Sequence, residues 1–299
     1  MRLKNLKSKI FLDGGDASET KEILNLLGFL DGQTTNPTLV SKNPEAEEKI
    51  GKGKRFTEFE VYDFYKGIVT EISSVIPKGS ISVEVYADLN TKVNEMIKQA
   101  RIMNSWIPNA HIKFPTTKEG IKAAGEALGM GIKVNMTLCF SQNQAAAVHC
   151  ATKGVSRGKV YVSPFVGRLD DAGEDGMSLV ENIIKMYKKG DSHVEVLTAS
   201  VRNLDHFLYA IYLGSDIITA PFKILKEWAD KNFPLPDKKN KHNQGNLKKI
   251  KYKNINLSKD WRKLNIFHNL TTSGIERFST DWNFLIKGEF RQRLSLDIK

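Results

Sequence analysis

Eight short β-rich segments alternate with longer helix-like segments between residues 10 and 222, and this alternation restricts the fold more than any other feature of the chain. The β-rich segments span 10–13, 31–35, 80–87, 110–115, 133–140, 159–167, 193–200 and 216–222. Strands that alternate with helices form parallel sheets, and eight such units usually close into a barrel. An open doubly wound sheet is the alternative, but no G-x-G-x-x-G motif follows the first strand. The pattern therefore predicts an α/β fold, a single (β/α)8 TIM-type barrel.

The remaining segments are predicted to extend this barrel, whose core spans about 10–225, so that residues 1–299 form one domain. Residues 41–60 are longer than the alternation needs and predict an extra polar helix or excursion after the second strand. The region 264–299 looks helical and amphipathic, which predicts a C-terminal helical extension; packing across a barrel end is one option, but the sequence does not place it. Residues 231–263 connect the two.

The formal net charge of +11 is concentrated in one part of the chain. Residues 223–263 hold 13 Lys or Arg against 4 Asp or Glu, so the rest of the chain is nearly neutral. We interpret this tract as a solvated basic connector, an exposed loop with fraying helical pieces, and keep an anionic docking surface as the alternative. A charge so localised argues against a nucleic-acid partner.

Other features exclude several protein classes. No segment approaches the ~20 unbroken apolar residues of a membrane helix, and the N-terminus lacks an apolar stretch of signal-peptide length. Two cysteines, Cys139 and Cys150, cannot form a disulfide scaffold or a zinc site by themselves. The histidines show no HxH or HExxH spacing. We therefore expect a cytoplasmic protein with no metal and no membrane partner.

Alternation along the predicted strands places polar side chains inside the barrel. In 80–87 the apolar set Ile81, Val83 and Val85 suits packing beneath helices, which turns Glu84 inward. By the same alternation the next strands turn inward His111 and Lys113, then Asn135, Thr137 and Cys139, then Tyr161 and Ser163. Barrel interiors are ordinarily apolar, and charged residues are rarely buried unless they are paired or functional. Mutual neutralisation of Glu84 and Lys113 is the structural alternative to a catalytic site.

An interior lysine suits carbonyl chemistry. Burial disfavours the charged form of a lysine, and the neutral amine can attack a carbonyl and form a Schiff base. The protonated imine withdraws electrons, so that a neighbouring C–C bond can break or form. The proton transfers require a carboxylate, for which Glu84 and Asp13 are the candidates near the carboxyl ends of their strands.

Several motifs around these residues resemble the transaldolase family. DGQTTNPTLV (31–40) is similar to its N-terminal signature, and AHIKFPTTKEGIKA (110–123) to the segment that bears its Schiff-base lysine. IKVNMTLCFSQNQA (132–145), VSPFVGRLDD (162–171) and ASVRNLDHFLYAIYLGSDIITAPF (199–222) follow in the family's order, and GIERFSTDW (274–282) is a shorter echo. The resemblance implies a (β/α)8 barrel with the lysine on the fourth strand, where Lys113 falls.

The resemblance also implies an activity and a role for each matched residue. Family members transfer a dihydroxyacetone unit from fructose 6-phosphate or sedoheptulose 7-phosphate to erythrose 4-phosphate or glyceraldehyde 3-phosphate. Lys113 would form the Schiff base, Asp13 would act on the C4 hydroxyl, and Glu84 would position the catalytic water with Thr137. The residues implied to bind substrate are Thr34, Asn36, Asn135, Ser163 and Phe165.

A phosphate site is predicted from the residues themselves. Arg168 follows the sixth predicted strand, whereas Ser200 and Arg202 follow the seventh. Two guanidinium groups and a hydroxyl at one barrel mouth suit a phosphate dianion, and isolated surface salt bridges are the alternative. The resembled family uses the same motif positions to bind the substrate phosphate.

Two rival functions remain open at this stage. The related fructose-6-phosphate aldolases typically carry a tyrosine where this chain has Phe165 and a glutamine where it has Glu84, so transfer is favoured and cleavage is the alternative. A non-catalytic barrel that binds anions or nucleic acid is an alternative of another class. Sugar phosphates are the expected partners, and no cofactor is needed because the lysine itself supplies the electron sink. Homo-oligomerisation is left open.

Overall fold

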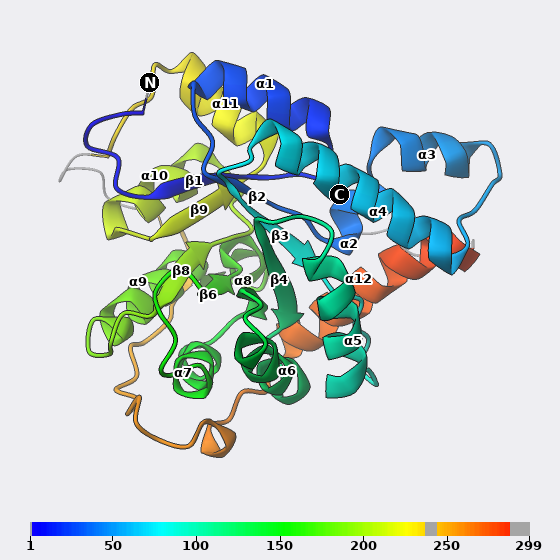
Figure 1. Ribbon diagram of the computed structural model, residues 1–299. Coiled ribbons are helices and arrows are strands. Elements are labelled where there is room, and N and C mark those ends of the chain that lie inside the picture. The colour runs from blue at the N-terminus through cyan, green and yellow to red at the C-terminus, as the bar shows by residue number, and fades with distance from the viewer. Residues whose placement is uncertain (1, 237–243, 288–299) are drawn as a thin grey trace.

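Eight parallel strands close into a barrel wrapped by helices (Figure 1). The structure is a computed structural model, and it describes residues 2–236 and 244–287. The barrel strands are β1 (Lys9–Asp13), β2 (Gly32–Thr34), β3 (Ser80–Glu84), β4 (Ala110–Pro115), β5 (Val134–Cys139), β6 (Val160–Pro164), β8 (Val194–Thr198) and β9 (Ile217–Ala220). The last strand pairs with the first, Lys9 opposite Ile217, which closes the ring. The predicted (β/α)8 barrel is confirmed.

Helices cover the outer face of the barrel between successive strands. The longer ones are α1 (Ala17–Leu27), α4 (Glu58–Val75), α5 (Val93–Asn104), α6 (Lys118–Gly129), α7 (Gln142–Ala151), α9 (Gly176–Tyr187), α10 (Leu204–Leu213) and α11 (Phe222–Asp230). Local signals set their ends: Asp16 accepts from Ser18 N at the start of α1, and Gly28 ends it at a φ of 71°. A short helix, α3 (Pro44–Gly51), lies where the polar excursion 41–60 was predicted, and another, α2 (Pro37–Ser41), directly precedes it.

The barrel interior is polar, as the alternation predicted. Asn135 Nδ2 donates to Ser82 Oγ at 3.0 Å, a bond that passes over β4 and so requires both side chains to face inward. Nearer the amino-terminal ends of the strands, His111 stacks on Tyr161 with ring centroids 4.1 Å apart. The apolar set of β3 is buried instead on the outer face beneath the helices.

A bulge in β5 changes the predicted alternation at one place. Leu138 takes a left-handed φ of 56°, and the register of β5 against β6 shifts between Met136 and Cys139. The extra residue turns Cys139 away from the barrel interior. Its Sγ lies instead on the outer side, 3.7 Å from Ser141 O at the start of α7. The prediction that Cys139 shares the inner face is therefore wrong, because it assumed an unbroken period of two.

Some strands end earlier than predicted. In the segment 159–167, strand β6 ends at Pro164, Phe165 makes one more bridge to Ala199, and a short helix, α8 (Val166–Asp171), then begins. Arg168 consequently lies on a helix at the barrel mouth and not directly after a strand. Similarly β8 ends at Thr198, and Ser200 follows at a φ of 58°. The residues that leave the ladder build the loops around the mouth.

The basic tract differs from the exposed connector that was predicted. Within the connector 231–263, the described residues contain no α-helix, only a short strand β10 (Lys248–Lys249), paired with β7 (Glu174–Asp175), and a 3-10 turn η1 (Trp261–Lys263). Ile250 O accepts from Asn182 Nδ2 of α9 at 2.8 Å, and Lys253 N donates to Gln142 Oε1 of α7 at 2.7 Å. The tract, orange in Figure 1, thus binds across two barrel helices, while residues 237–243 lie outside the described residues.

The C-terminal region forms α12 (Asn269–Lys287), as the amphipathic pattern predicted, and residues 288–299 lie outside the described residues. The helix packs on α2 and on β5, and Thr38 Oγ1 donates to Asp281 Oδ2. It therefore lies against the carboxyl-terminal end of the barrel. Within the described residues, no helix is long and apolar enough to cross a lipid bilayer.

Candidate functional site

A cavity at the carboxyl ends of the strands collects all but two of the residues predicted to form the site. Those that line it are Asp13, Thr34, Asn36, Lys113, Thr137, Ser163, Phe165, Arg168, Ser200 and Arg202. The remaining two predicted residues, Glu84 and Asn135, are buried but do not line the cavity wall. Parallel strands bring their carboxyl ends to one face, which is why residues scattered along the sequence meet here.

A buried lysine–carboxylate pair lies at the cavity floor. Lys113 and Glu84 are register partners on β4 and β3, and their Nζ and Oε2 atoms are 2.8 Å apart. Lys113 Nζ also donates to Thr35 O at 2.9 Å. The two side chains are only 4% and 5% exposed. Burial raises the pKa of Glu84 and the Lys113 charge opposes that rise, so Glu84 can take up a proton more readily than an exposed carboxylate.

Asp13 provides a second carboxylate at the end of β1. It accepts a hydrogen bond from Thr34 Oγ1 at 2.7 Å, and Thr34 in turn contacts Thr219 Oγ1 of β9 at 2.6 Å. Burial raises the pKa of Asp13, while Lys113 and the Thr34 hydroxyl lower it. A carboxylate held in this balance suits proton exchange with a substrate hydroxyl.

Two neighbouring residues of β5 differ in what they offer a ligand. Thr137 Oγ1 is buried and has no hydrogen-bond partner among the described residues, although it lines the cavity. Asn135 instead uses its amide, donating to Ser82 Oγ and accepting from Ser163 Oγ at 2.7 Å. Thr137 is therefore free to hold a water or substrate, whereas Asn135 lies one layer deeper and fixes Ser163.

Two other predicted residues shape the wall of the cavity. Asn36 Oδ1 accepts from Leu39 N at 2.9 Å and so caps α2, which makes it a structural residue as well as a wall residue. Phe165 packs edge-on against Phe140, with ring centroids 5.8 Å apart. It contributes an apolar surface without a hydroxyl.

Three arginines gather at the cavity mouth. Arg168 has no hydrogen bond or ion pair within the described part of the chain, and its pKa is lowered by burial and then by the charges of Arg277 and Arg202. Arg202 Nη2 pairs with Asp171 at 2.7 Å. A Cβ added at Gly167 would lie 2.3 Å from Arg202 Nε, so only glycine allows this approach. The charge of Arg168, which has no ion-pair partner of its own among the described residues, beside two further guanidinium groups suits a phosphate dianion.

Sequence reasoning missed Arg277, which reaches the cavity from α12. Its nearest carboxylate is Asp281, at 3.9 Å on the same helix. The motif GIERFSTDW contains this arginine and was the one available signal. Nothing local to that motif indicates that α12 crosses the barrel mouth, so the arginine's place in the site required the fold.

Comparisons with known proteins agree with this geometry. The family model described as Transaldolase/Fructose-6-phosphate aldolase matches residues 10–288. A probable transaldolase of Dehalococcoides mccartyi is 34% identical over 279 residues, 93% of this chain and 100% of the relative. A probable transaldolase of Thermoplasma volcanium is 39% identical over 218 residues, 73% of this chain and 86% of the relative.

The likeness to solved structures is weaker. The crystal structure of 3-hexulose-6-phosphate synthase from Salmonella typhimurium superposes with a TM-score of 0.45 at 11% identity, over 76% of this chain and 100% of that chain. The assignment comes from the sequence matches, which span nearly the whole chain. The protein belongs to the transaldolase/fructose-6-phosphate aldolase family.

Proposed function

We propose that this protein is a transaldolase, which moves a dihydroxyacetone unit from a ketose phosphate to an aldose phosphate through a Schiff base on Lys113. One observation carries the proposal: a buried lysine 2.8 Å from a carboxylate lies on the floor of a cavity that Asp13 also lines. Mutual neutralisation alone would explain the pair, but it would not explain the open cavity above the lysine or the arginines at its mouth.

The first step is activation of the amine. Glu84 is the acceptor for the proton of the Lys113 ammonium group, and burial, which raises the pKa of that carboxyl group, makes this transfer easier than to an exposed carboxylate. The neutral amine then attacks the C2 carbonyl of fructose 6-phosphate or sedoheptulose 7-phosphate. The resulting carbinolamine loses water to form the imine, and Glu84 with the unpartnered hydroxyl of Thr137 would hold that water.

The second step breaks the carbon chain. Asp13 takes the proton of the donor's C4 hydroxyl, the C3–C4 bond breaks, and its electron pair moves into the protonated imine. The aldose phosphate leaves, and the dihydroxyacetone unit stays on Lys113 as an enamine. Attack of the enamine on the acceptor aldehyde then reverses these steps, with Asp13 returning the proton.

Phosphate binding fixes the substrate along the cavity. Arg168, Arg202 and Arg277 would contact the phosphate oxygens, with the Ser200 hydroxyl as a further donor. Because both donor and acceptor carry a phosphate, a single anion site serves both half-reactions.

Transfer is favoured over simple cleavage by what surrounds the enamine. The related aldolases resembled by this chain typically carry a tyrosine at the position of Phe165 and a glutamine at that of Glu84. Phe165 is 9% exposed and brings no hydroxyl to hold a water near the enamine. The intermediate would therefore persist until an aldehyde arrives.

The proposal is tested by glyceraldehyde 3-phosphate release from fructose 6-phosphate, with and without erythrose 4-phosphate. Release that requires the acceptor supports transaldolase, whereas equal release without it would make the protein an aldolase. Borohydride should trap the donor on Lys113 in either case. No release and no trapped adduct would contradict both activities. Sugar phosphates are the substrates that the family implies, a cytoplasmic location is a prediction from the sequence, and homo-oligomerisation is left open.

A further inference from the structure

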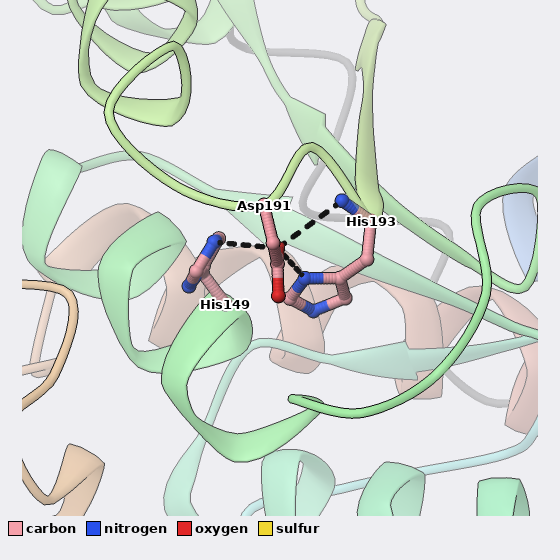
Figure 2. Close-up of side chains that lie close together, drawn as sticks. All are labelled: His149, Asp191 and His193. Atoms are coloured by element: carbon pink, nitrogen blue, oxygen red, sulfur yellow. Dashed lines mark hydrogen bonds and ion pairs between the residues drawn. The ribbon is translucent and has the colours of Figure 1, made fainter.

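Three potential metal ligands converge at the opposite end of the barrel from Lys113. His149 projects from α7, His193 directly precedes β8, and Asp191 comes from the loop between α9 and β8; Figure 2 shows the carboxylate between the two imidazoles. Their ligand atoms all lie within 4.8 Å of one another. We propose that these three side chains form a structural site for a divalent cation of the zinc class.

The hydrogen bonds around His193 require a cation at its Nδ1. Thr152 Oγ1 donates its single hydrogen to Val148 O at 2.8 Å, so it can only accept from His193 Nε2, 2.9 Å away. The hydrogen on a neutral His193 ring is then on Nε2, and Nδ1 presents a lone pair. That lone pair directly faces Asp191 Oδ1, an acceptor. Two facing lone pairs are repulsive, so in this contact Nδ1 carries a proton, which a metal ion bound by both atoms would displace as they move apart.

The environment of His149 favours a metal ion over a proton as the explanation of this cluster. Its Nε2 lies 3.3 Å from Asp191 Oδ1 without hydrogen-bond geometry, and neither ring nitrogen has a hydrogen-bond partner among the described residues. The side chain is nevertheless only 3% exposed. Two ligands at zinc bond lengths in a tetrahedral site lie about 3.3 Å apart and direct their lone pairs at the ion, not at each other. A proton on His193 explains the contact between His193 and Asp191 but leaves both nitrogens of the buried His149 without a hydrogen-bond partner in the described part of the chain. A single ion bound by all three side chains would give each of them a partner.

The surroundings give an ion access from solvent. A Cβ added at Gly190 would lie 2.4 Å from His149 Nε2, so only glycine lets the loop backbone approach this nitrogen so closely. Asp191 is 53% exposed, which gives an entry path and a place for water as fourth ligand. Two imidazoles with one carboxylate suit zinc, whereas calcium and magnesium prefer oxygen ligands throughout. The Nε2–H of His193 already has the hydrogen-bond partner that metal-bound imidazoles usually have.

The site would stabilise the fold without taking part in the aldol reaction. It would join the end of α7 to the loop that enters β8, next to the docked basic tract, whose Leu257 side chain also lies beside Gly190. The histidine spacing in the sequence gave no sign of it, because the ligands come from two elements.

The test is zinc binding by the full-length chain after chelator treatment, followed by calorimetry with zinc chloride. We expect about one ion per chain, a higher melting temperature with zinc, and turnover that stays the same. Cobalt substituted for zinc should give the visible absorption of a four-coordinate site. Asp191→Asn keeps the side-chain shape and should weaken zinc binding at least about 100-fold, since even groups that only orient a ligand contribute about 10–100-fold. His149→Gln should act similarly.

Cys150→Ser is the matched control, because Cys150 neighbours His149 and thiols bind zinc strongly. We expect it to bind zinc as the unaltered chain does. The proposal is overturned if the unaltered chain shows no saturable binding, in which case a proton on His193 explains the contact. It is also overturned if Asp191→Asn and His149→Gln bind zinc normally, or if only Cys150→Ser loses binding. The cobalt spectrum of the unaltered chain supplies an answer even if a variant folds poorly.

Discussion

Two layers of polar side chains lie inside the same barrel, and they differ in how completely they are paired. In the layer near the amino-terminal ends of the strands, His111 Nδ1 contacts Ser80 Oγ at 2.7 Å and Nε2 contacts Gly158 O at 3.1 Å. Its ring stacks on Tyr161. Both nitrogens of this imidazole have a partner. Glu195, beside Tyr161 on β8, is the exception in this layer: its Oε1 pairs with Lys9 Nζ at 3.0 Å, but its buried Oε2 has no hydrogen bond among the described residues.

The layer near the carboxyl-terminal ends is incompletely paired. Thr137 Oγ1 and Arg168 have no hydrogen-bond partner within the described residues, and burial raises the pKa of both Asp13 and Glu84. Groups that are fully paired stabilise a fold, whereas buried groups left unpaired are available to a ligand. The contrast indicates that the first layer supports the barrel and that the second performs the chemistry.

The largest expected effect comes from removing the nucleophile. Lys113→Ala should lower kcat/KM for acceptor-dependent glyceraldehyde 3-phosphate release by at least about 1000-fold, a loss of about 4 kcal/mol in transition-state stabilisation. Lys113→Arg should fail as well, because a guanidinium stays protonated and cannot form the imine. Neither variant should give a borohydride-trapped adduct by mass spectrometry. An active Lys113→Ala variant would contradict the conclusion that the layer near the carboxyl-terminal ends of the strands performs the chemistry.

A smaller loss is expected when the chemistry is interrupted after the Schiff base. Asp13→Asn should lower kcat by about 100- to 10,000-fold, the usual contribution of a general acid–base group. The imine should still form, because Lys113 and Glu84 are intact. Mass spectrometry after borohydride treatment should therefore detect the trapped donor. Absence of the adduct would show that Asp13 acts on imine formation and not on C3–C4 cleavage.

The difference between the layers was partly predictable from the sequence. Strand alternation is a local property, so it correctly turned Glu84, Lys113, Tyr161 and Ser163 into the barrel. It failed at Leu138, where one left-handed residue restarts the alternation and turns Cys139 outward. A bulge of this kind depends on how two strands pair, and the sequence of one strand does not reveal it.

The mouth of the site was harder to predict than its floor. Arg168 and Arg202 follow strand segments closely, so their approximate place came from the alternation. Arg277 is remote in sequence, and it reaches the cavity only because α12 packs on α2 and β5. The basic tract was misread for the same reason, since its side-chain and backbone bonds to α7 and α9 are long-range contacts. Local patterns predict elements, whereas the mouth is built by how those elements pack.

A substitution of Arg277 would show whether the substrate-binding groups at the carboxyl-terminal end of the barrel include a residue of α12. Arg277→Gln should raise KM for fructose 6-phosphate by about 10- to 100-fold, the range expected for a hydrogen bond to a charged group. The rate with unphosphorylated fructose should change little, and Arg168→Gln is the matched variant on α8. Equal losses with both sugars would mean that Arg277 supports the structure of α12, where it lies 3.9 Å from Asp281 one turn further along the same helix, and does not bind the phosphate.

The smallest effect on activity is expected in the paired layer, where stability should change instead. His111→Leu should leave kcat within about twofold while lowering the free energy of unfolding by about 1–3 kcal/mol, because Ser80 and Gly158 lose a buried partner.

The pH dependence of stability sharpens this last prediction. Burial lowers the pKa of His111 from 6.5 to about 3, so between these values the unfolded chain binds a proton that the folded chain does not. The free energy of unfolding should therefore fall as pH falls below about 6.5, and His111 should account for about 2 kcal/mol of the loss by about pH 5. Burial also lowers the pKa of His149, to about 4, so His149 adds to the loss of stability at low pH. This contribution is the same in the unaltered chain and in His111→Leu, so it cancels when the two are compared. Urea unfolding at about pH 7 and about pH 5 should give His111→Leu the shallower dependence. Identical pH dependences, or a large loss of kcat in the variant, would mean that the paired layer is not the passive support that its hydrogen bonds indicate.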